Sequence, residues 1–337
     1  MKIKRVGTYI TGFKYYKYRS GKPDKHGKPD KPDKHGKPDK HGKHGKPDKH
    51  GKPDKPDKPD KEEKADIGSE ITDEDTINKI KKFKIPPSYD NVVILNNKKI
   101  LAYGYDSKGR KQVIYNSKHI EKQNEQKYEK IQRFDKHFIK IKKQVAKDLK
   151  SPDEKNKIIA IIITLILSCG FRIGNTKYEK QNKSYGITTL NYSHIKLLND
   201  YTVSFDFIGK KGVRNQAICK NKYIYSYLSE KLDILETPST EAAECNKYSE
   251  YIFKYNNRRI TADDVNNYLM CKLKVNITTK DLRTWNANNL FNKYLHKYRN
   301  EKNPVKKALE LTSFELHNTS NVCKKSYIDP KRLLKAL

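Results

Sequence analysis

Several features that define large classes of protein are missing from this sequence. The longest apolar run, Ile158 to Leu167, is far shorter than the roughly 20 residues that a helix needs to cross a bilayer. The N-terminal MKIKRVGTYI has no long apolar core and no small-residue cleavage site, so no signal peptide is expected. The cysteines contain no C-x-x-C pair, which predicts a reducing compartment without a disulfide framework or structural zinc. They are Cys169, Cys219, Cys245, Cys271 and Cys323.

Acidic residues are scarce relative to basic ones. The chain has 73 Lys plus Arg but only 40 Asp plus Glu, for a formal net charge of +33. A surplus of this size indicates a polyanionic partner, either nucleic acid or an anionic membrane surface. Because the apolar runs are short, nucleic acid is the favoured partner and no membrane association is expected. The hydrophobic content of 34% over 337 residues is enough for two modest domains with their own cores.

Residues 21–60 form a low-complexity tract of K-P-D and K-H-G units. The tract holds 8 of the 14 prolines and no aliphatic or aromatic residue, so it cannot bury apolar surface and is expected to be disordered. Its 13 Lys and 8 Asp contribute little to the net charge, so the basic character belongs to the rest of the chain. Its five histidines could bind a divalent metal weakly, although a solvated spacer is the favoured interpretation.

The remaining sequence predicts an α+β fold with a β-rich N-terminal part and a helical C-terminal part. Short β-branched and aromatic runs between residues 90 and 115, separated by N-N and D-S-K-G, predict an antiparallel meander. Residues 201–218 alternate apolar and polar positions around G-K-K-G, which predicts a β-hairpin with lysines at its tip. The periodicity is helical from about residue 120, and the run Ile158 to Cys169 predicts a buried helix.

Two sequence signals predict helix starts. Thr72 with Asp75, and Thr261 with Asp264, have the spacing of an N-terminal capping box. The first of these helices is expected to end at Pro86-Pro87, because proline lacks the amide hydrogen that a helix interior requires.

Cations occur at places where a fold alone would not require them. Arg172 directly follows the apolar run, Lys210 lies at the hairpin tip, and the string K-D-L-R-T-W places Lys280 and Arg283 three residues apart. A Lys-Lys pair, Lys324-Lys325, stands beside Tyr327. Any one of them could be a solvated charge, or the partner of a carboxylate such as Asp281.

Together, these residue types suit the cleavage of a phosphodiester. Two arginines can bind its non-bridging oxygens bidentately, a lysine can protonate the leaving oxygen, and a tyrosine can be the nucleophile if nearby cations lower its pKa. Enzymes that use Mg²⁺ for phosphoryl transfer need clustered carboxylates instead. The sequence shows no such cluster near these motifs and no Walker-type loop, so neither metal, cofactor nor ATP is expected.

The order of seven strings resembles a type IB DNA topoisomerase of the small poxvirus and bacterial kind. The match covers nearly the whole chain outside the repeat tract. The strings are I-P-P-S-Y-D-N-V, G-Y-D-S-K-G-R-K-Q, C-G-F-R-I-G-N-T-K-Y, S-Y-G-I-T-T-L, F-I-G-K-K-G-V, T-K-D-L-R-T-W and N-T-S-N-V-C-K-K-S-Y-I-D-P.

The resemblance implies a role for each cation and for one tyrosine. Tyr327 matches the nucleophile that forms a covalent 3′-phosphotyrosyl link and releases a 5′-hydroxyl. Arg172 and Arg283 match the arginines on the scissile phosphate, and Lys210 matches the general acid for the 5′-oxygen. Lys280 matches a lysine that contacts the same phosphate region. Because the covalent bond conserves the energy of the phosphodiester, religation without ATP and relaxation of positive and negative supercoils are implied.

Two positions depart from the poxvirus pattern. Nine residues before the tyrosine, poxvirus enzymes carry a histidine, but this chain has Asn318. An adjacent histidine, His317, is the alternative. A one-residue step along a helix turns a side chain by about 100°, which favours Asn318. The major-groove reader Q-Y-x-Y is represented by Gln112 and Tyr115, with Val113 in place of a tyrosine, so the sequence preference for the cleavage site is expected to be weaker or different.

The resemblance also implies the domain organisation and the partner. Residues 1–120 correspond to a β-rich DNA-binding domain with the disordered insertion at 21–66, and residues 121–337 to a mostly helical catalytic domain. A monomer is expected to clamp double-stranded DNA, inside the cell and at DNA, in the virion or cytoplasmic factory of a large DNA virus. The DNA contacts implied outside the catalytic set are Gln112, Tyr115, Tyr178, Lys324 and Lys325.

Two other classes of protein remain possible at this point. A tyrosine recombinase would share the nucleophile and both arginines, but it typically has H-x-x-R where this chain has Lys280-x-x-Arg283, and it lacks the N-terminal meander. A non-catalytic DNA-packaging protein would account for the charge but not for the joint presence of the catalytic residue types.

Overall fold

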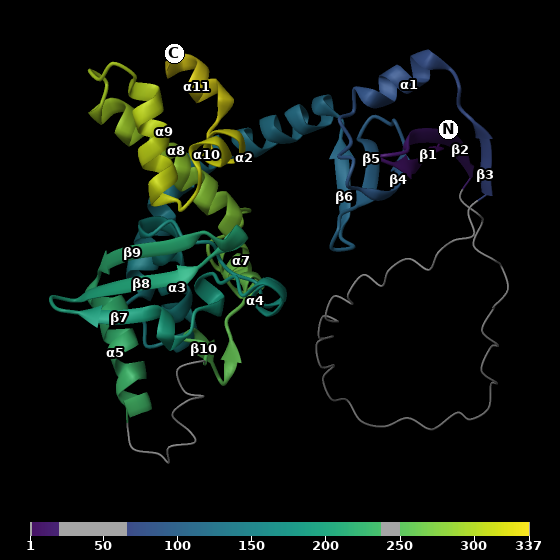
Figure 1. The fold of residues 1–337 in the computed structure, drawn as a ribbon. Helices are drawn as coiled ribbons and strands as arrows, with labels where there is room; N and C mark the ends of the chain where they lie inside the picture. The colour runs from purple at the N-terminus through teal and green to yellow at the C-terminus, as the bar shows by residue number, and fades with distance from the viewer. Residues whose placement is uncertain (1, 20–65, 237–249, 337) are drawn as a thin grey trace, which may run out of the picture. The chain divides into compact units, whose positions relative to one another are not determined.

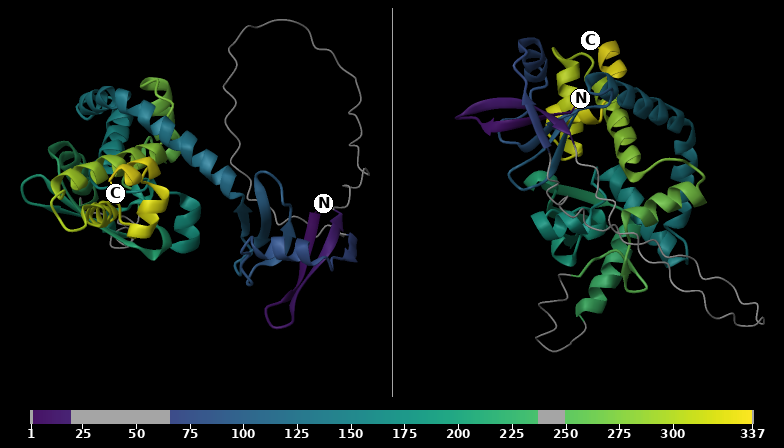
Figure 2. Two further views of the ribbon diagram at one scale, coloured as in Figure 1. Left: turned by 90° about the horizontal axis from the view of Figure 1, so that it is seen from above. Right: turned by 90° about the vertical axis from the view of Figure 1, so that its right-hand side faces the viewer.

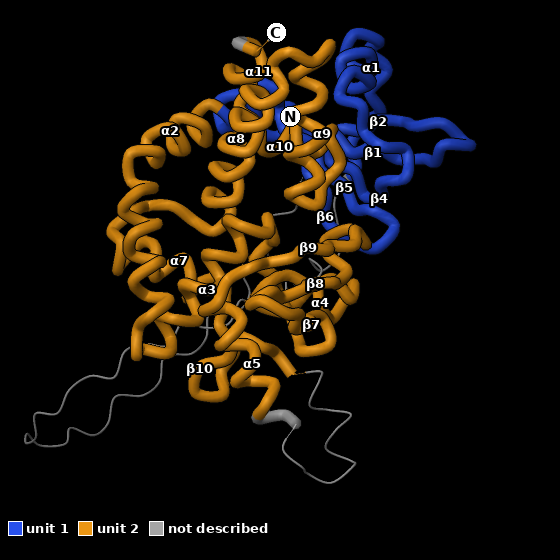
Figure 3. The backbone as a smooth tube through the Cα atoms, turned by 90° about the vertical axis from the view of Figure 1, so that its left-hand side faces the viewer, with its two compact units in different colours: residues 1–124 blue, residues 125–337 orange. Residues whose placement is uncertain are grey.

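The computed structural model describes residues 2–19, 66–236 and 250–336. The chain divides into two compact units, unit 1 (residues 1–124) and unit 2 (residues 125–337), coloured separately in Figure 3. Helix α2, Ser117–Asp148, begins in unit 1 and continues in unit 2. The repeat tract and Cys245 lie outside the described residues. Within the described part, no helix is both long enough and apolar enough to cross a membrane.

Unit 1 is built on a six-stranded antiparallel sheet (Figure 1). The strand order is β3-β2-β1-β4-β5-β6. The predicted meander is confirmed as β4 to β6, whereas β3 was not predicted because its sequence D-I-G-S-E has little apolar alternation. The hairpin of β1 and β2 projects from the rest of the unit in both views of Figure 2. The strands are β1 Lys2–Thr8, β2 Gly12–Arg19, β3 Asp66–Glu70, β4 Asp90–Ile94, β5 Ile100–Tyr105 and β6 Lys111–Tyr115.

Helix α1, Glu74–Lys81, packs Ile80 into the core of unit 1. The predicted cap at Thr72 is wrong, because the Asp73 carboxylate accepts the Thr76 amide at 2.9 Å and so starts the helix one residue later. The helix also ends earlier than predicted, at Lys82 and before the two prolines. The run T-D-E-D offers more than one residue that can cap a helix, so the choice depends on which carboxylate reaches an amide.

Unit 2 contains a three-stranded antiparallel sheet of β7 Ile195–Leu198, β8 Thr202–Ile208 and β9 Arg214–Lys220. The predicted hairpin is confirmed as β8 and β9, which are joined by a tight turn containing Lys210–Gly212. Lys211 occupies the left-handed backbone region there, with φ +64°. Helix α5, Lys222–Glu236, packs against this sheet (Figure 1).

The predicted buried helix is confirmed as α3, Glu154–Ser168, which is capped by Asp153. Its isoleucines are almost fully buried in the main core of unit 2, and each such burial contributes about 1.5–3 kcal/mol. The second predicted capping box is also confirmed, because Thr261 and Asp264 close the start of α7. A smaller core joins α8, α9 and the C-terminal segment, and α9 packs against both α8 and α10.

The remaining elements of unit 2 are mostly helical, so the chain as a whole is α+β. The remaining α-helices are α4 Thr176–Asn182, α7 Ala262–Asn267, α8 Thr279–Lys297, α9 Pro304–Glu315, α10 Ser320–Ser326 and α11 Pro330–Ala336. The short elements are the 3-10 turns η1 Ile187–Thr189 and η2 Tyr192–His194, the π-helical turn Tyr268–Lys272, and the strand pair β10 Lys254–Tyr255 and β11 Arg258–Arg259.

Candidate active site

Tyr327 lies at the C-terminal end of α10, and its backbone amide donates to the Cys323 carbonyl at 3.0 Å. Its half-buried ring packs against the smaller core of unit 2. Asn288 of α8 fixes the main chain here, since its side-chain amide donates to the Tyr327 carbonyl at 2.8 Å and its oxygen accepts the Asp329 amide at 2.9 Å. Tyr327 is therefore held by its backbone, while its hydroxyl remains available for chemistry.

Arg283 is positioned by the first turns of α8. The helix starts with a capping box between Thr278 and Asp281, and Arg283 is buried, with 3% of its surface exposed. Its Nε lies 3.4 Å from the Tyr327 hydroxyl, and its Nη2 donates to the Leu316 carbonyl. The guanidinium carbon lies 5.3 Å from the centre of the tyrosine ring. Arg283 is therefore in contact with the predicted nucleophile.

The alternative in which Asp281 neutralises Arg283 does not hold in the structure. The Asp281 carboxylate instead accepts hydrogen bonds from the amide and the hydroxyl of Thr278, both at 3.0 Å. It also pairs with Lys130 of α2 at 2.7 Å. This pairing also ties α2 to the start of α8.

Arg172 follows α3 in a loop that packs against residues 315–317. Gly170 has φ +59°, and a Cβ there would lie 2.2 Å from the Glu315 carbonyl oxygen, so only glycine fits this close approach. The loop places the Arg172 guanidinium against the side-chain oxygen of Asn318, to which it donates. Arg172 is also close enough to Tyr327 to lower the pKa of its hydroxyl, so Arg172, Arg283 and Tyr327 come together from three separate parts of the sequence.

The charges at this cluster are unbalanced. Among the described residues, neither Arg172 nor Arg283 forms an ion pair with a carboxylate. The pKa of Arg283 is lowered to about 10, mainly by burial and also by Arg172, while Tyr327 opposes the shift. Burial alone would raise the pKa of Tyr327, but Arg283 and Arg172 outweigh it and hold that pKa below its usual value. The cluster therefore makes Tyr327 easier to deprotonate than an ordinary tyrosine.

Two buried hydrogen-bond donors at the same cluster have no partner within the described part of the chain. They are Nη1 of Arg283 and Nδ2 of Asn318. Buried donors in proteins are almost always satisfied, and leaving one unsatisfied costs about 1–3 kcal/mol. Two cationic side chains and two unused donors around one hydroxyl make a site suited to an anion with several oxygens.

His317 makes its contacts with the loop that precedes Arg172. Its Nε2 donates to the Cys169 carbonyl at 3.0 Å, and its ring stacks on Phe171 at 5.3 Å between centroids. The choice of Asn318 over His317 rested on a helical rotation, and that premise was wrong, because the segment between α9 and α10 is a turn in which His317 has φ +47°. Asn318 nevertheless lies at Arg172, while His317 helps hold the loop that carries Arg172.

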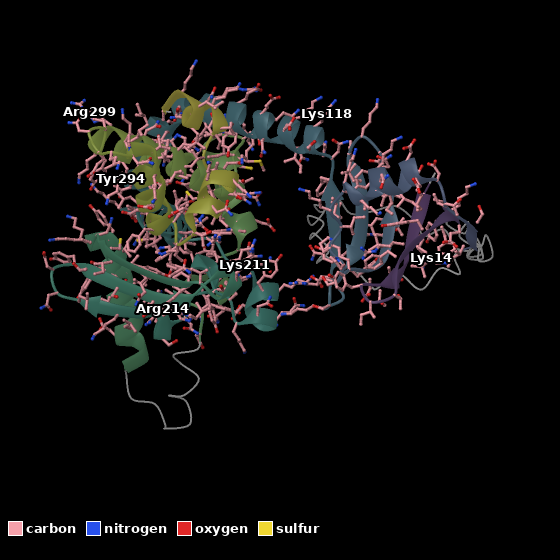
Figure 4. The ribbon with its side chains drawn as sticks, turned by 45° about the horizontal axis from the view of Figure 1, so that its top comes forward. Lys14, Lys118, Lys211, Arg214, Tyr294 and Arg299 are labelled. Carbon is pink, nitrogen blue, oxygen red and sulfur yellow. The ribbon has the colours of Figure 1, made fainter. Side chains whose placement is uncertain are left out.

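The two lysines predicted to act in catalysis, Lys280 and Lys210, lie on different elements of unit 2. Lys280 is exposed in the first turn of α8 and lies close enough to Lys127 of α2 to lower the pKa of that residue. Lys210 is exposed at the hairpin tip, where Figure 4 labels its neighbours Lys211 and Arg214. The described hydrogen bonds and ion pairs do not connect Lys210 to the Tyr327 cluster.

The predicted DNA contacts lie at exposed or half-buried positions. Gln112 and Tyr115 are on β6 of unit 1, where Gln112 Nε2 donates to Asp106 at 3.0 Å. A hydrogen bond from Arg110 lowers the pKa of the Asp106 carboxyl well below its usual range, so Gln112 donates to a carboxylate. The other three predicted contacts are exposed in unit 2: Tyr178 on α4, and Lys324 and Lys325 on α10.

Sequence reasoning missed Asn288 and Lys127. Both act on main-chain groups next to Tyr327, through hydrogen bonds that span 39 residues and 199 residues of sequence. The string N-A-N-N, which follows the apolar Trp285 and contains two buried asparagines, was the available signal for Asn288. In the part of the chain that the structure describes, no group of three His, Cys, Asp or Glu residues could hold a metal ion.

Comparison with known proteins agrees with this geometry. The family described as "Eukaryotic DNA topoisomerase I, catalytic core" matches residues 116–326, one residue short of Tyr327. "DNA topoisomerase 1B" of Acanthamoeba polyphaga mimivirus is 31% identical over 280 residues, which are 78% of this chain and 80% of the relative. The protein of the same name from vaccinia virus (strain Copenhagen) is 27% identical over 220 residues, covering 63% of this chain and 64% of the relative.

Among solved structures, the post-cleavage complex of the XerH site-specific recombinase with palindromic difH substrate aligns with a TM-score of 0.37 at 16% identity, covering 58% of this chain and 49% of that chain. The family match spans more than half of the chain, and the mimivirus relative extends over most of it. The curated relatives quoted above are topoisomerases rather than recombinases or packaging proteins. The chain therefore belongs to the type IB DNA topoisomerases, of the kind found in large DNA viruses.

Proposed function

We propose that this topoisomerase cleaves one strand of DNA through attack of the Tyr327 hydroxyl oxygen on a backbone phosphorus. The new bond joins that oxygen to the 3′-phosphate, and the bond that breaks joins the phosphorus to the 5′-oxygen. The observation that carries the proposal is the meeting of Arg172, Arg283 and Tyr327 at one half-buried point with no carboxylate partner among the described residues.

The arginine pair has two tasks in this reaction. Both lower the pKa of Tyr327 in the free protein, which increases the fraction of phenolate available for attack. When the phosphate enters, the unused Nη1 of Arg283 and Nδ2 of Asn318 can bind its non-bridging oxygens, and the Arg172 guanidinium adds a second cation beside them. Charge develops on these oxygens in the transition state, so donors that are already oriented lower the barrier.

The 5′-oxygen needs a proton as it leaves. Lys210 is exposed at a hairpin tip held by the Gly209 amide, which donates to the Val213 carbonyl at 2.7 Å. We assign Lys210 as the general acid and Lys280, on the exposed side of α8, as a second cation for the same phosphate region. In the reverse reaction the 5′-hydroxyl attacks the phosphorus and the Tyr327 oxygen leaves. This rejoins the strand and requires no ATP.

Unit 1 is proposed to bind the duplex through Gln112 and Tyr115, with Gln112 exchanging its bond to Asp106 for a base edge. Phosphate contacts from Tyr178, Lys324 and Lys325 are proposed to hold the strand near Tyr327. A single chain supplies all of these groups, so we propose a monomer that encloses double-stranded DNA, acting wherever the viral genome is replicated or packaged.

The proposal predicts relaxation of positively and negatively supercoiled plasmid in EDTA without ATP. Stopping the reaction with detergent and digesting the protein is expected to yield one nucleotide-linked peptide, the one containing Tyr327. Linking number and mass spectrometry are the two measurements. A plasmid that is bound but keeps its linking number, or an adduct on another tyrosine, would contradict the proposal.

A second prediction concerns Lys210. Lys210→Ala is expected to slow single-turnover cleavage by about 10²–10⁴-fold, the usual contribution of a general acid. The loss is expected to shrink to a few-fold when sulfur replaces the bridging 5′-oxygen, because a thiolate leaves without being protonated. Cleavage rates on the two substrates provide the test.

Lys211→Ala is the matched control for this variant, because it removes the same charge from the adjacent exposed position of the same turn. It is expected to cleave both substrates at nearly the wild-type rate. An equal loss on both substrates for Lys210→Ala would show that Lys210 binds DNA without donating a proton.

A further inference from the structure

The helix α2 holds the main chain and side chains on both sides of Tyr327. Lys127 Nζ donates to the carbonyl of Ser326 at 3.1 Å. One and a half turns further along α2, Gln132 Nε2 donates to the carboxylate of Asp329 at 3.3 Å. The residue before Tyr327 and the second residue after it are thus both attached to the same helix.

Lys127 and Asn288 form a pair of backbone anchors. Asn288 of α8 holds the Tyr327 carbonyl, and Lys127 of α2 holds the carbonyl one residue earlier. Because consecutive carbonyls are fixed from two different helices, the Tyr327 Cα has little freedom to rotate or shift. The ammonium of Lys127 also lies 4.1 Å from the centre of the Tyr128 ring, which is a second contact for this side chain.

The charged groups around Lys127 come from every element packed on it. The pKa of Lys127 is lowered to about 8, mainly by burial and also by Lys280 of α8, against the opposing effects of Tyr327, Asp281 and Asp329. The interaction with Tyr327 is reciprocal: a phenolate that favours the ammonium of Lys127 is itself favoured by that ammonium. Lys127 therefore loses its charge at a lower pH than an ordinary lysine does.

We propose that Lys127 is a positioning residue for the nucleophile, which orients Tyr327 through the Ser326 carbonyl and stabilises its phenolate while the lysine is protonated. The inference rests on the proposed role of Tyr327 and adds a basic group outside the arginine pair. The orientation of Tyr327 and the stabilisation of its phenolate can be tested separately, because they depend on different properties of the lysine. The hydrogen bond needs only an N–H, whereas the stabilisation of the phenolate needs the positive charge.

Three substitutions distinguish the two parts. Lys127→Gln keeps a donor but removes the charge, Lys127→Ala removes both, and Lys127→Arg keeps both at every pH below about 12. The measurement is the single-turnover rate of covalent adduct formation on a short duplex whose cleaved end diffuses away, recorded from pH 6 to pH 10.

The ratio of the wild-type rate to the Lys127→Gln rate is the informative quantity. Below pH 8 the wild-type lysine is charged, and we expect the ratio to be about five to ten, equivalent to somewhat less than one unit in the phenol pKa. At and above pH 8 the lysine loses its proton, so the ratio is expected to fall towards one. Bound phosphates shift this fall to higher pH but not to lower pH. The ratio of the Lys127→Arg rate to the Lys127→Gln rate is expected to stay constant above pH 8, because the charge of the arginine persists.

Lys136→Ala is the matched control, because Lys136 is an exposed lysine of the same helix, and no described hydrogen bond or ion pair joins it to Tyr327 or to the residues on either side of it. It is expected to follow the wild-type profile. A ratio near one at pH 7, or a ratio that is constant with pH, would overturn the role of the charge. Lys127→Ala is expected to be slower than Lys127→Gln at every pH, and equal rates would overturn the anchoring role. If the wild type forms no adduct at Tyr327, the proposed nucleophile fails instead.

Discussion

Tyr327→Phe is expected to abolish relaxation of supercoiled plasmid and formation of the covalent adduct, a loss of several orders of magnitude in the cleavage rate. Removal of a nucleophile leaves only the catalysis supplied by binding and electrostatics, and phenylalanine offers no atom that can attack phosphorus. Binding of duplex DNA is expected to survive, because the cations that we propose to contact phosphate are unchanged. Plasmid relaxation and filter binding, measured on the same preparation, test the two halves of this prediction.

Tyr201→Phe provides the control for removal of a phenolic hydroxyl. Tyr201 is 54% exposed in the turn before β8 and lies outside the proposed catalytic cluster, so this variant is expected to relax plasmid like the wild type. Residual relaxation by Tyr327→Phe above the background of the preparation would assign the nucleophile to another residue. Loss of both relaxation and DNA binding would indicate misfolding, and circular dichroism would then decide.

The fold could be predicted where the hydrophobic pattern was long and strong. The apolar run that became α3 and the alternation that became the β8–β9 hairpin needed no information beyond their own residues. Weak patterns failed: β3 was missed, and Asp73 rather than Thr72 caps α1. In both cases the outcome depends on a partner that sequence does not reveal, a neighbouring strand for β3 and a reachable amide for Asp73.

The site shows the same division between local and long-range information. Arg283 and Tyr327 could be identified by resemblance, but the contact between Arg172 and Asn318 joins residues 146 positions apart. The periodicity of apolar residues in the sequence could not predict that contact. The turn at His317 illustrates the limit, because its positive φ rotates the chain in a way that a helical wheel does not describe. Lys127 and Asn288 act on backbone carbonyls, which have no sequence signature.

The second large effect is expected at Arg283. Arg283→Ala is predicted to slow cleavage by about 10²–10³-fold, the usual result of removing one donor that stabilises charge in a transition state. It also removes the donor that the buried Leu316 carbonyl uses, so a stability loss of about 1–3 kcal/mol is expected as well. Thermal unfolding measures the second effect separately. Arg299→Ala, at an exposed position after α8 that Figure 4 labels, is the control and is expected to change neither quantity.

A change in the substrate separates the role of Arg283 in catalysis from its role in structure. If Arg283 neutralises charge on the non-bridging oxygens, replacing one of them with a methyl group removes the charge that the arginine serves. The defect of Arg283→Ala is then expected to fall from about 10²–10³-fold to a few-fold on the methylphosphonate duplex. Arg283→Lys is expected to be intermediate on the ordinary duplex, because lysine keeps the charge but lacks the planar fork. A defect of the same size on both substrates would mean that Arg283 supports the position of Tyr327 rather than the charge of the phosphate.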